Sequence, residues 1–132
     1  MNKSQDLVIF TQTYDLLSWL LPQCEKFPKS QRFVITQRLQ NAALDFQEQI
    51  FDANTHFDSE RLKYLQRADG HLNKLRLYLR LSHHWEWLSD GQYQHVSKMV
   101  SQIGKLLGGW IKQTRAGSSD TRGHYGGKRG RP

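Results

Sequence analysis

The sequence has one cysteine among its 132 residues, Cys24, so it cannot be held together by internal disulfide bonds. A lone thiol suits a reducing compartment, and we expect a cytoplasmic protein. Long apolar runs are also missing, because no stretch approaches 18 uninterrupted apolar residues, and we therefore expect no membrane span. The N-terminal residues lack the small-residue cleavage site of a secretory signal.

Proline is almost as scarce, at positions 22, 28 and 132, and alternating strand patterns bounded by turn dipeptides are absent. Helical periodicity is the main pattern, which predicts an all-α fold in one domain. A first helix is expected from about 6 to 27, with Pro22 causing a kink or a broken turn and Pro28 ending the helix. Its predicted buried stripe consists of Leu7, Phe10, Tyr14, Leu17, Leu21 and Cys24.

Three further helices follow the same spacing rule. The second, from 29 to about 54, is expected to bury Ile35, Leu39, Ala42, Phe46, Ile50 and Ala53. The third, from 58 to about 87, has Asp58 or Ser59 as its predicted N-cap and a stripe of Leu62, Leu65, Leu72, Leu75 and Leu79. The fourth opens with a capping box of Ser89 and Gln92 and repeats through Tyr93, Val96, Val100, Ile103, Leu107 and Trp110.

The predicted helix ends and the lengths of the connections indicate how the helices are arranged. The fourth helix is expected to end near Arg115, with Gly117 as its C-cap. Because the connections are short, neighbouring helices must be antiparallel, and residues 1–115 are predicted to form an up-down-up-down four-helix bundle. Residues 116–132 contain five of the ten glycines and little to bury, so we expect a flexible, disordered basic tail.

Acidic residues are scarce in the second half of the chain. Residues 1–60 carry five basic and eight acidic side chains, whereas residues 61–115 carry ten basic and three acidic ones, within a formal total of +7. On a helical wheel, Lys63, Arg67 and Lys74 form an outward ridge opposite the leucine stripe. Arg76 and Arg80 flank the stripe, where acidic side chains of the first two helices are available as partners. The fourth helix adds Lys98, Lys105, Lys112 and Arg115.

A basic helix face has two interpretations. It is commonly a solvated surface, but here the separation of charge is larger than solubility requires and continues into a Gly/Arg tail. The pattern therefore favours a polyanionic partner. Phosphate contacts of this kind bind without reading sequence and weaken as salt rises.

The sequence lacks residue patterns typical of metal-binding or catalytic sites. His83 and His84 are adjacent and point to different helix faces, and His71 and His95 have no ligand partner at metal-binding spacing. No triad order, phosphate loop or HExxH motif occurs, so we expect no metal, no cofactor and no enzymatic activity. An enzyme whose active site is hidden between the helices remains an alternative.

Small and aromatic residues indicate close packing. Gly104 and Gly108 share a helix face, and such a notch admits a backbone or an aromatic ring, either within the bundle or between subunits. Trp85 and Trp87 cannot both face one core, which favours an oligomer or a protein interface.

Several short segments resemble one family. They are Leu21-Pro22, Phe27-Pro28-Lys29, Arg32-Phe33, Gln37-Arg38-Leu39, the run from Leu75 to Leu81, and the distinctive Ile103-Gly104-Lys105-Leu106-Leu107-Gly108-Gly109-Trp110-Ile111-Lys112. In kind and order they resemble the accessory variability determinant (Avd) proteins of diversity-generating retroelements, over about residues 15 to 113. A broader relative is the four-helix protein encoded in intervening sequences of bacterial 23S ribosomal RNA genes, whose typical second-helix segment is missing here.

The resemblance implies a four-helix protomer in a homopentamer with a basic outer surface. It also implies a reverse transcriptase as partner and template RNA as ligand, in support of mutagenic cDNA synthesis. By position, Arg76, Arg80, Lys105 and Lys112 become candidates for nucleic-acid or polymerase contact, whereas Gly104, Gly108 and Trp110 become packing or assembly positions. The alternative is a structural helical adaptor that binds proteins and no nucleic acid.

Overall fold

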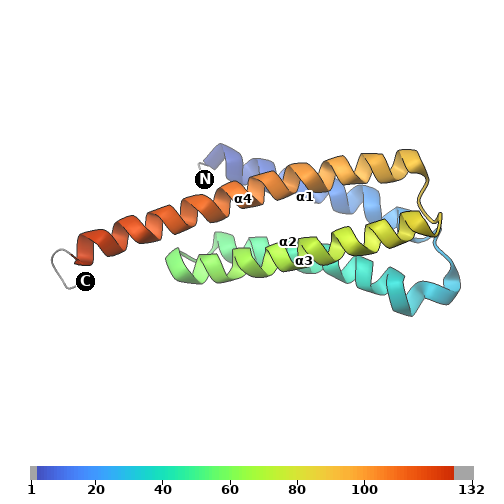
Figure 1. Ribbon diagram of the computed structural model, residues 1–132, viewed down its shortest axis with the longest axis horizontal. Coiled ribbons are helices and arrows are strands. Elements are labelled where there is room, and N and C mark those ends of the chain that lie inside the picture. Colours follow the sequence, from blue (N-terminus) through green and yellow to red (C-terminus); the bar gives the residue numbers. More distant parts are fainter. Residues whose placement is uncertain (1–2, 127–132) are drawn as a thin grey trace.

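The computed structural model describes the backbone of residues 3–126 and the side chains of residues 8–117. Every regular element in this range is helical: α1 (Lys3–Cys24), a 3₁₀ turn η1 (Lys29–Gln31), a π-helical segment η2 (Arg32–Thr36), α2 (Gln37–Asn54), α3 (Asp58–His84) and α4 (Asp90–Gly126). Consecutive helices run in opposite directions (Figure 1), and α4 packs back against α1. The predicted all-α, up-down-up-down four-helix bundle is confirmed.

The buried face of α1 differs from the predicted one. The helix buries Ile9, Thr13, Leu16, Leu20 and Cys24, so of the predicted stripe only Cys24 lies in the core among the described side chains. The buried stripe includes one polar residue, Thr13. Its hydroxyl donates to the carbonyl of Ile9 at 2.7 Å, so the polar atom is satisfied inside the helix and its burial costs little.

Apart from Cys24, the described residues of the predicted α1 stripe lie at the edge of the core or outside it. Phe10, Leu17 and Leu21 are half-buried, and Tyr14 is 65% exposed. Leu7 lies outside the range of described side chains. A second apolar face of α1 is thereby left at the surface of the protomer.

The end of α1 also comes earlier than predicted. The helix stops at Cys24, two residues beyond Pro22, and the amides of Glu25, Lys26 and Phe27 then bond to the carbonyls three residues before them, at 3.1–3.2 Å. Pro22 lies inside the helix, where it has no N–H to donate to the carbonyl of Ser18, and the chain tightens into 3₁₀-like turns two residues later. The helix therefore ends before Pro28.

The predicted second helix is helical throughout but irregular at its start. The segments η1 and η2 precede the regular α2, and the π-helical turn changes the rotation of the residues around it. As a result Thr36 is buried and Ile35 is half-buried. From Leu39 onward the predicted positions are buried as expected.

The start of α3 is held by an arginine of the helix itself. No side chain caps its N-terminus, so the predicted cap by Asp58 or Ser59 is wrong, and Asp58 has a left-handed φ of 54°. Arg61 instead donates to the carbonyls of Ala53 and Asn54, at 2.8 and 3.4 Å. A cation is favourable there because the C-terminal carbonyls of α2 carry partial negative charge.

The start of α4 matches the prediction. The Ser89 amide donates to Gln92 Oε1 at 2.9 Å, and the Gln92 amide donates to Ser89 Oγ at 3.1 Å, which is a reciprocal capping box. The predicted stripe from Val96 to Trp110 is buried, with Tyr93 half-buried at its start.

The end of α4 is later than predicted. The helix continues through Gly117 to Gly126, so the expected end near Arg115 is wrong. Glycine lowers helix propensity but keeps its N–H, and no proline interrupts residues 116–126. With 37 residues α4 is ~56 Å long at 1.5 Å per residue, and it extends past the other helices (Figure 1). Of the predicted tail, residues 116–132, the first part up to Gly126 is helical, and residues 127–132 lie outside the described residues.

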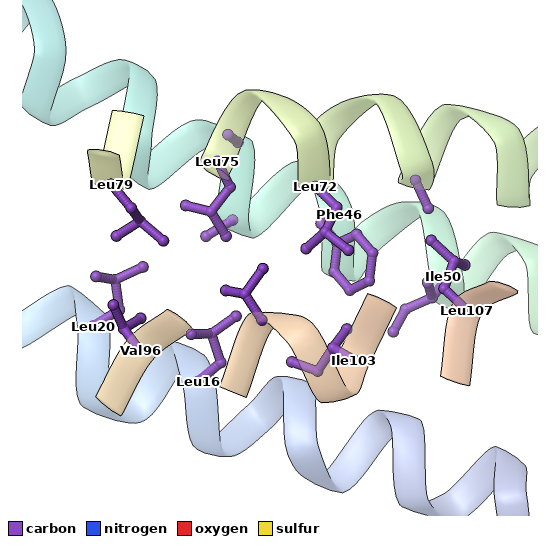
Figure 2. Packing of buried hydrophobic residues seen from close by; sticks show 14 of the residues in the cluster. Leu16, Leu20, Phe46, Ile50, Leu72, Leu75, Leu79, Val96, Ile103 and Leu107 are labelled. Carbon is purple, nitrogen blue, oxygen red and sulfur yellow. The ribbon is translucent and has the colours of Figure 1, made fainter. Parts of the chain in front are cut away.

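All four helices contribute to one core. Figure 2 shows apolar side chains converging between them: Leu16 and Leu20, Phe46 and Ile50, Leu72, Leu75 and Leu79, and Val96, Ile103 and Leu107. The polar side chains left outside this interior set the chemistry of each face. None of the helices in the described range is both long and apolar enough to cross a membrane.

Candidate nucleic-acid interface

The basic side chains singled out from the sequence all reach the surface. Each of the nine is exposed: Lys63, Arg67, Lys74, Arg76 and Arg80 on α3, and Lys98, Lys105, Lys112 and Arg115 on α4. Because α3 and α4 pack against each other, these charges belong to the half of the bundle that the two helices form. The neighbouring pair α1 and α2 carries the excess of acidic residues.

Ion pairing does not neutralise this basic half. Among the described side chains, no lysine or arginine forms a salt bridge with a carboxylate, and the two charge pairs found both use histidine. They join His56 to Glu60 at 3.8 Å and His83 to Asp90 at 2.7 Å. The expected pairing of Arg76 and Arg80 with acidic side chains of α1 or α2 therefore does not occur. Their charges remain available to an external anion.

The ridge of α3, defined as Lys63, Arg67 and Lys74, lies on the outer surface of that helix. The Arg67 guanidinium carbon lies 5.4 Å from the centre of the Tyr64 ring, within the range of a cation–π contact. This contact orients the arginine along the helix surface and leaves its N–H groups free of carboxylates.

Gly104 of α4 provides space for Arg76 of α3. A Cβ atom at this position would overlap Nη2 of Arg76 and would lie 3.7 Å from its Cζ. Nη1 of the same guanidinium donates to Asn73 Oδ1 at 2.7 Å. The notch predicted at Gly104 thus holds an arginine head group within the protomer. Gly108 is exposed, and a Cβ atom added there would meet no atom within 4 Å.

Trp110 is enclosed by the protomer. Its ring meets the Phe10 ring edge-on, with centroids 6.3 Å apart, and the Arg61 guanidinium carbon lies 5.7 Å from its centre. Only 1% of the residue is exposed, which places it in the packing between α1, α3 and α4.

A groove between α3 and α4 brings two of the predicted arginines together with residues that the sequence did not single out as polar partners. Its cavity measures about 260 Å³, and it is lined by Arg76, Leu79, Arg80, Tyr93, Ser97, Val100 and Ser101. The missed residues Ser97 and Ser101 lie four apart, as do Arg76 and Arg80. That matching spacing on consecutive helices was the available signal, but only the packing shows that the two pairs face one groove.

An apolar groove lies on the other half of the bundle. Its cavity measures about 490 Å³ between α1 and α2, and it includes Tyr14, Leu44 and Phe51, which are 65%, 39% and 50% exposed. Gln47 also lines it, and its buried Oε1 has no hydrogen-bond partner in the described part of the chain. At the turn between α3 and α4, Trp85 is 45% exposed, and its ring is tilted against the ring of Trp87, with centroids 5.1 Å apart.

Cys24 is a buried thiol, and the described histidines are not grouped as metal ligands. Burial raises the pKa of the Cys24 thiol to about 12, so the nucleophilic thiolate is scarce at neutral pH. The residue belongs to the hydrophobic core. Across the described residues, no group of three or more His, Cys, Asp or Glu side chains is placed to hold a metal ion.

Comparison with known proteins agrees with this architecture. A family model described as bAvd-like matches residues 7–114. No curated protein matches the chain. Among solved structures, a protein with unknown function from the S23 ribosomal protein family of Bacteroides thetaiotaomicron superimposes with a TM-score of 0.74 at 19% sequence identity. The alignment covers 82% of this chain and 98% of that protein, and at this identity it shows the shared fold alone.

Proposed function

Because this chain belongs to the bAvd-like family, we propose that it is a non-enzymatic accessory subunit of the reverse transcriptase of a diversity-generating retroelement. In this role it binds the template RNA and the polymerase in the cytoplasm and supports mutagenic cDNA synthesis. The family match covers residues 7–114, which include α2, α3 and most of α1 and α4, and so supports the role for this part of the chain.

The observation that carries the proposal is the unpaired basic side of the bundle. Nine exposed cations on α3 and α4 have no carboxylate partner among the described side chains. Lysine and arginine side chains that contact a nucleic-acid backbone neutralise its phosphates and release the counterions condensed on it. This release provides affinity without base recognition. Rigid helices fix the backbone positions from which these charged side chains extend, so binding requires no ordering of the backbone.

Self-assembly is the second part of the proposal. The family resemblance implies a homopentamer, and the apolar groove between α1 and α2 supplies a surface that a second copy would cover. Its exposed Tyr14 and Phe51 offer aromatic anchors of the kind enriched in interfaces, and a donor from the neighbouring copy would satisfy Gln47 Oε1. This groove lies on the half opposite to the basic side, so assembly leaves the cations accessible.

A structural adaptor without nucleic-acid binding is the rival function. The exposed Trp85 and the apolar groove favour it, because both suit protein partners. The two functions differ in the response to RNA.

Titration of labelled single-stranded RNA with the full chain, at several salt concentrations, tests the proposal. Binding should weaken by orders of magnitude between about 50 and 200 mM salt, and a random DNA strand should bind with the same dependence. Absence of binding at low salt, or binding insensitive to salt, contradicts it and favours the adaptor.

The polymerase part needs a separate test. A tagged chain co-expressed with the reverse transcriptase encoded beside it should retain that enzyme on purification. The neighbouring genes should also include a pair of near-identical repeats. A locus without a reverse transcriptase contradicts the retroelement role.

A further inference from the structure

The groove between α3 and α4 has the size of a site for one chemical group. Its volume of about 260 Å³ lies below the roughly 300–1,000 Å³ of pockets that enclose whole small molecules. The buried Leu79 and Val100 lie beneath more exposed polar side chains. An apolar base of this kind reduces water access and strengthens electrostatic contacts above it.

The polar rim of the groove consists of hydrogen-bond donors and carries positive charge only. Arg76 and Arg80 occupy successive turns of α3, and Ser97 and Ser101 occupy successive turns of α4. Guanidinium groups have no acceptor, hydroxyl groups can donate, and no carboxylate lines the groove. A ligand that fits must therefore be anionic and offer several acceptor oxygens, which describes a phosphate group.

Arg76 is held in place before any ligand binds. Asn73 accepts a hydrogen bond from its Nη1 at 2.7 Å, and the missing Cβ of Gly104 makes room for its Nη2. These two constraints reduce the rotamer freedom that an exposed arginine otherwise loses on binding. Gly104 thereby acts as a positioning residue through Arg76.

The serine hydroxyls of the groove are uncommitted. In other helical positions the hydroxyls of Ser82 and Thr114 donate to the carbonyl four residues before them, at 2.7 and 2.8 Å. Ser97 and Ser101 form no side-chain hydrogen bond in the described part of the chain, and neither does the guanidinium of Arg80. Donors from both helices therefore remain available to one ligand.

We propose that this groove binds one phosphodiester group of the RNA backbone, with Arg76 and Arg80 on one rim and Ser97 and Ser101 on the other. The inference rests on the proposed function and adds to it a defined contact point within the broader basic side. The α3 ridge then supplies diffuse attraction, whereas the groove fixes the position of the strand along the bundle.

Two pairs of variants, each a groove variant with its control, test the groove without changing the net charge of the protein. Any difference in RNA affinity within a pair therefore reflects the groove and not the overall charge. Gly104→Ala adds a methyl group that displaces the Arg76 guanidinium, and Gly108→Ala adds the same group at an open position of the same helix. Ser97→Ala with Ser101→Ala removes both hydroxyls, and Ser30→Ala with Ser59→Ala removes two exposed hydroxyls elsewhere. Circular dichroism checks that each variant keeps its helices.

Affinity for a labelled single-stranded RNA is measured by fluorescence anisotropy at a single salt concentration. Gly104→Ala and the Ser97/Ser101 variant should each bind about fivefold to tenfold more weakly than the wild type, as expected for losing part of a charge-assisted contact. The Gly108→Ala and Ser30/Ser59 controls should stay within about twofold. If the groove variants bind RNA as their controls do, the inference is overturned while the proposed function stands.

Inorganic phosphate provides a readout that does not depend on RNA. Titration should shift the backbone amide NMR signals of Ser97 and Ser101 in the wild type and much less in Gly104→Ala. If the wild type does not bind RNA, the proposed function fails and the phosphodiester assignment fails with it. If phosphate then still shifts the amide signals of Ser97 and Ser101, the groove is an anion site that does not bind RNA. If phosphate shifts neither signal, the groove is not an anion site.

Discussion

The two halves of this bundle have grooves of similar origin and opposite chemistry. Between α1 and α2 the groove is apolar and exposes Tyr14 and Phe51, whereas between α3 and α4 it is lined by Arg76, Arg80 and hydroxyl groups. Both grooves lie between adjacent antiparallel helices, and both helix pairs share one core. The comparison teaches that the residues beside the core stripe, rather than the helical framework, decide the chemistry of each face.

The largest expected effect comes from breaking the core on which both halves depend. Trp110→Ala should lower the free energy of unfolding by about 3–5 kcal/mol, because it empties a site between three helices. Trp85→Ala is the matched control, since Trp85 is 45% exposed, and it should cost about 1 kcal/mol or less. Urea unfolding followed by circular dichroism measures both. Equal costs for the two variants would show that Trp110 is not a core residue.

Charge reversal on the basic half should have the next largest effect. Changing Lys63, Arg67 and Lys74 to Glu should weaken RNA binding about 10²-fold at low salt and flatten the salt dependence, because three phosphate contacts are lost. The control changes Lys26, Lys29 and Arg38 to Glu, which alters net charge equally but lies on the other half. Fluorescence anisotropy with labelled RNA compares them. Equal losses in the two variants would show that net charge alone matters.

The apolar half can be tested by a single charge. Phe51→Glu should weaken self-association about tenfold or more, because an interface that buries Phe51 would lose the burial of an aromatic side chain. Leu77→Glu introduces the same charge at a residue of similar exposure on α3, 52% against 50%, and should leave assembly intact. Light scattering across a concentration series gives the masses. A wild type with the mass of one chain at every concentration contradicts assembly altogether.

The smallest expected effect concerns helix ends within the basic half. Ser89→Ala should lower the free energy of unfolding by about 1 kcal/mol, because the Gln92 amide loses its capping partner. Ser59→Ala should change it by less than about 0.5 kcal/mol, since no side chain caps α3. Thermal unfolding of the two variants provides the comparison. A larger loss at Ser59 would contradict the observed start of α3.

Prediction from sequence succeeded where one pattern dominated. In α4 the apolar residues from Val96 to Trp110 form a single stripe, so the buried face follows from periodicity alone. In α1 two apolar stripes lie side by side, and the buried one includes the polar Thr13. The Thr13 hydroxyl is satisfied by a hydrogen bond to the Ile9 carbonyl, and that bond depends on the rotamer that the packed core selects.

The exposure of the basic side chains in the candidate site was predictable from the sequence. Exposure of the cations on α3 and α4 follows from their position outside the leucine stripes, and the structure places them at the surface. The start of α3 was not predictable in this way. In the sequence Arg61 is one more positive charge, whereas in the structure it caps the end of α2, a role set by the geometry of the turn.

The sequence by itself determined the four-helix arrangement of the bundle, the buried stripes of α3 from Leu65 and of α4 from Val96, and the separation of acidic from basic halves. These properties depend on spacing along the chain, which packing does not alter. Only the tertiary structure decided which face of α1 is buried, that Arg76 rests on Gly104, and that two serines share a groove with two arginines. Each of these depends on the rotation of one helix relative to another, and that rotation is set when all four helices pack around a common core.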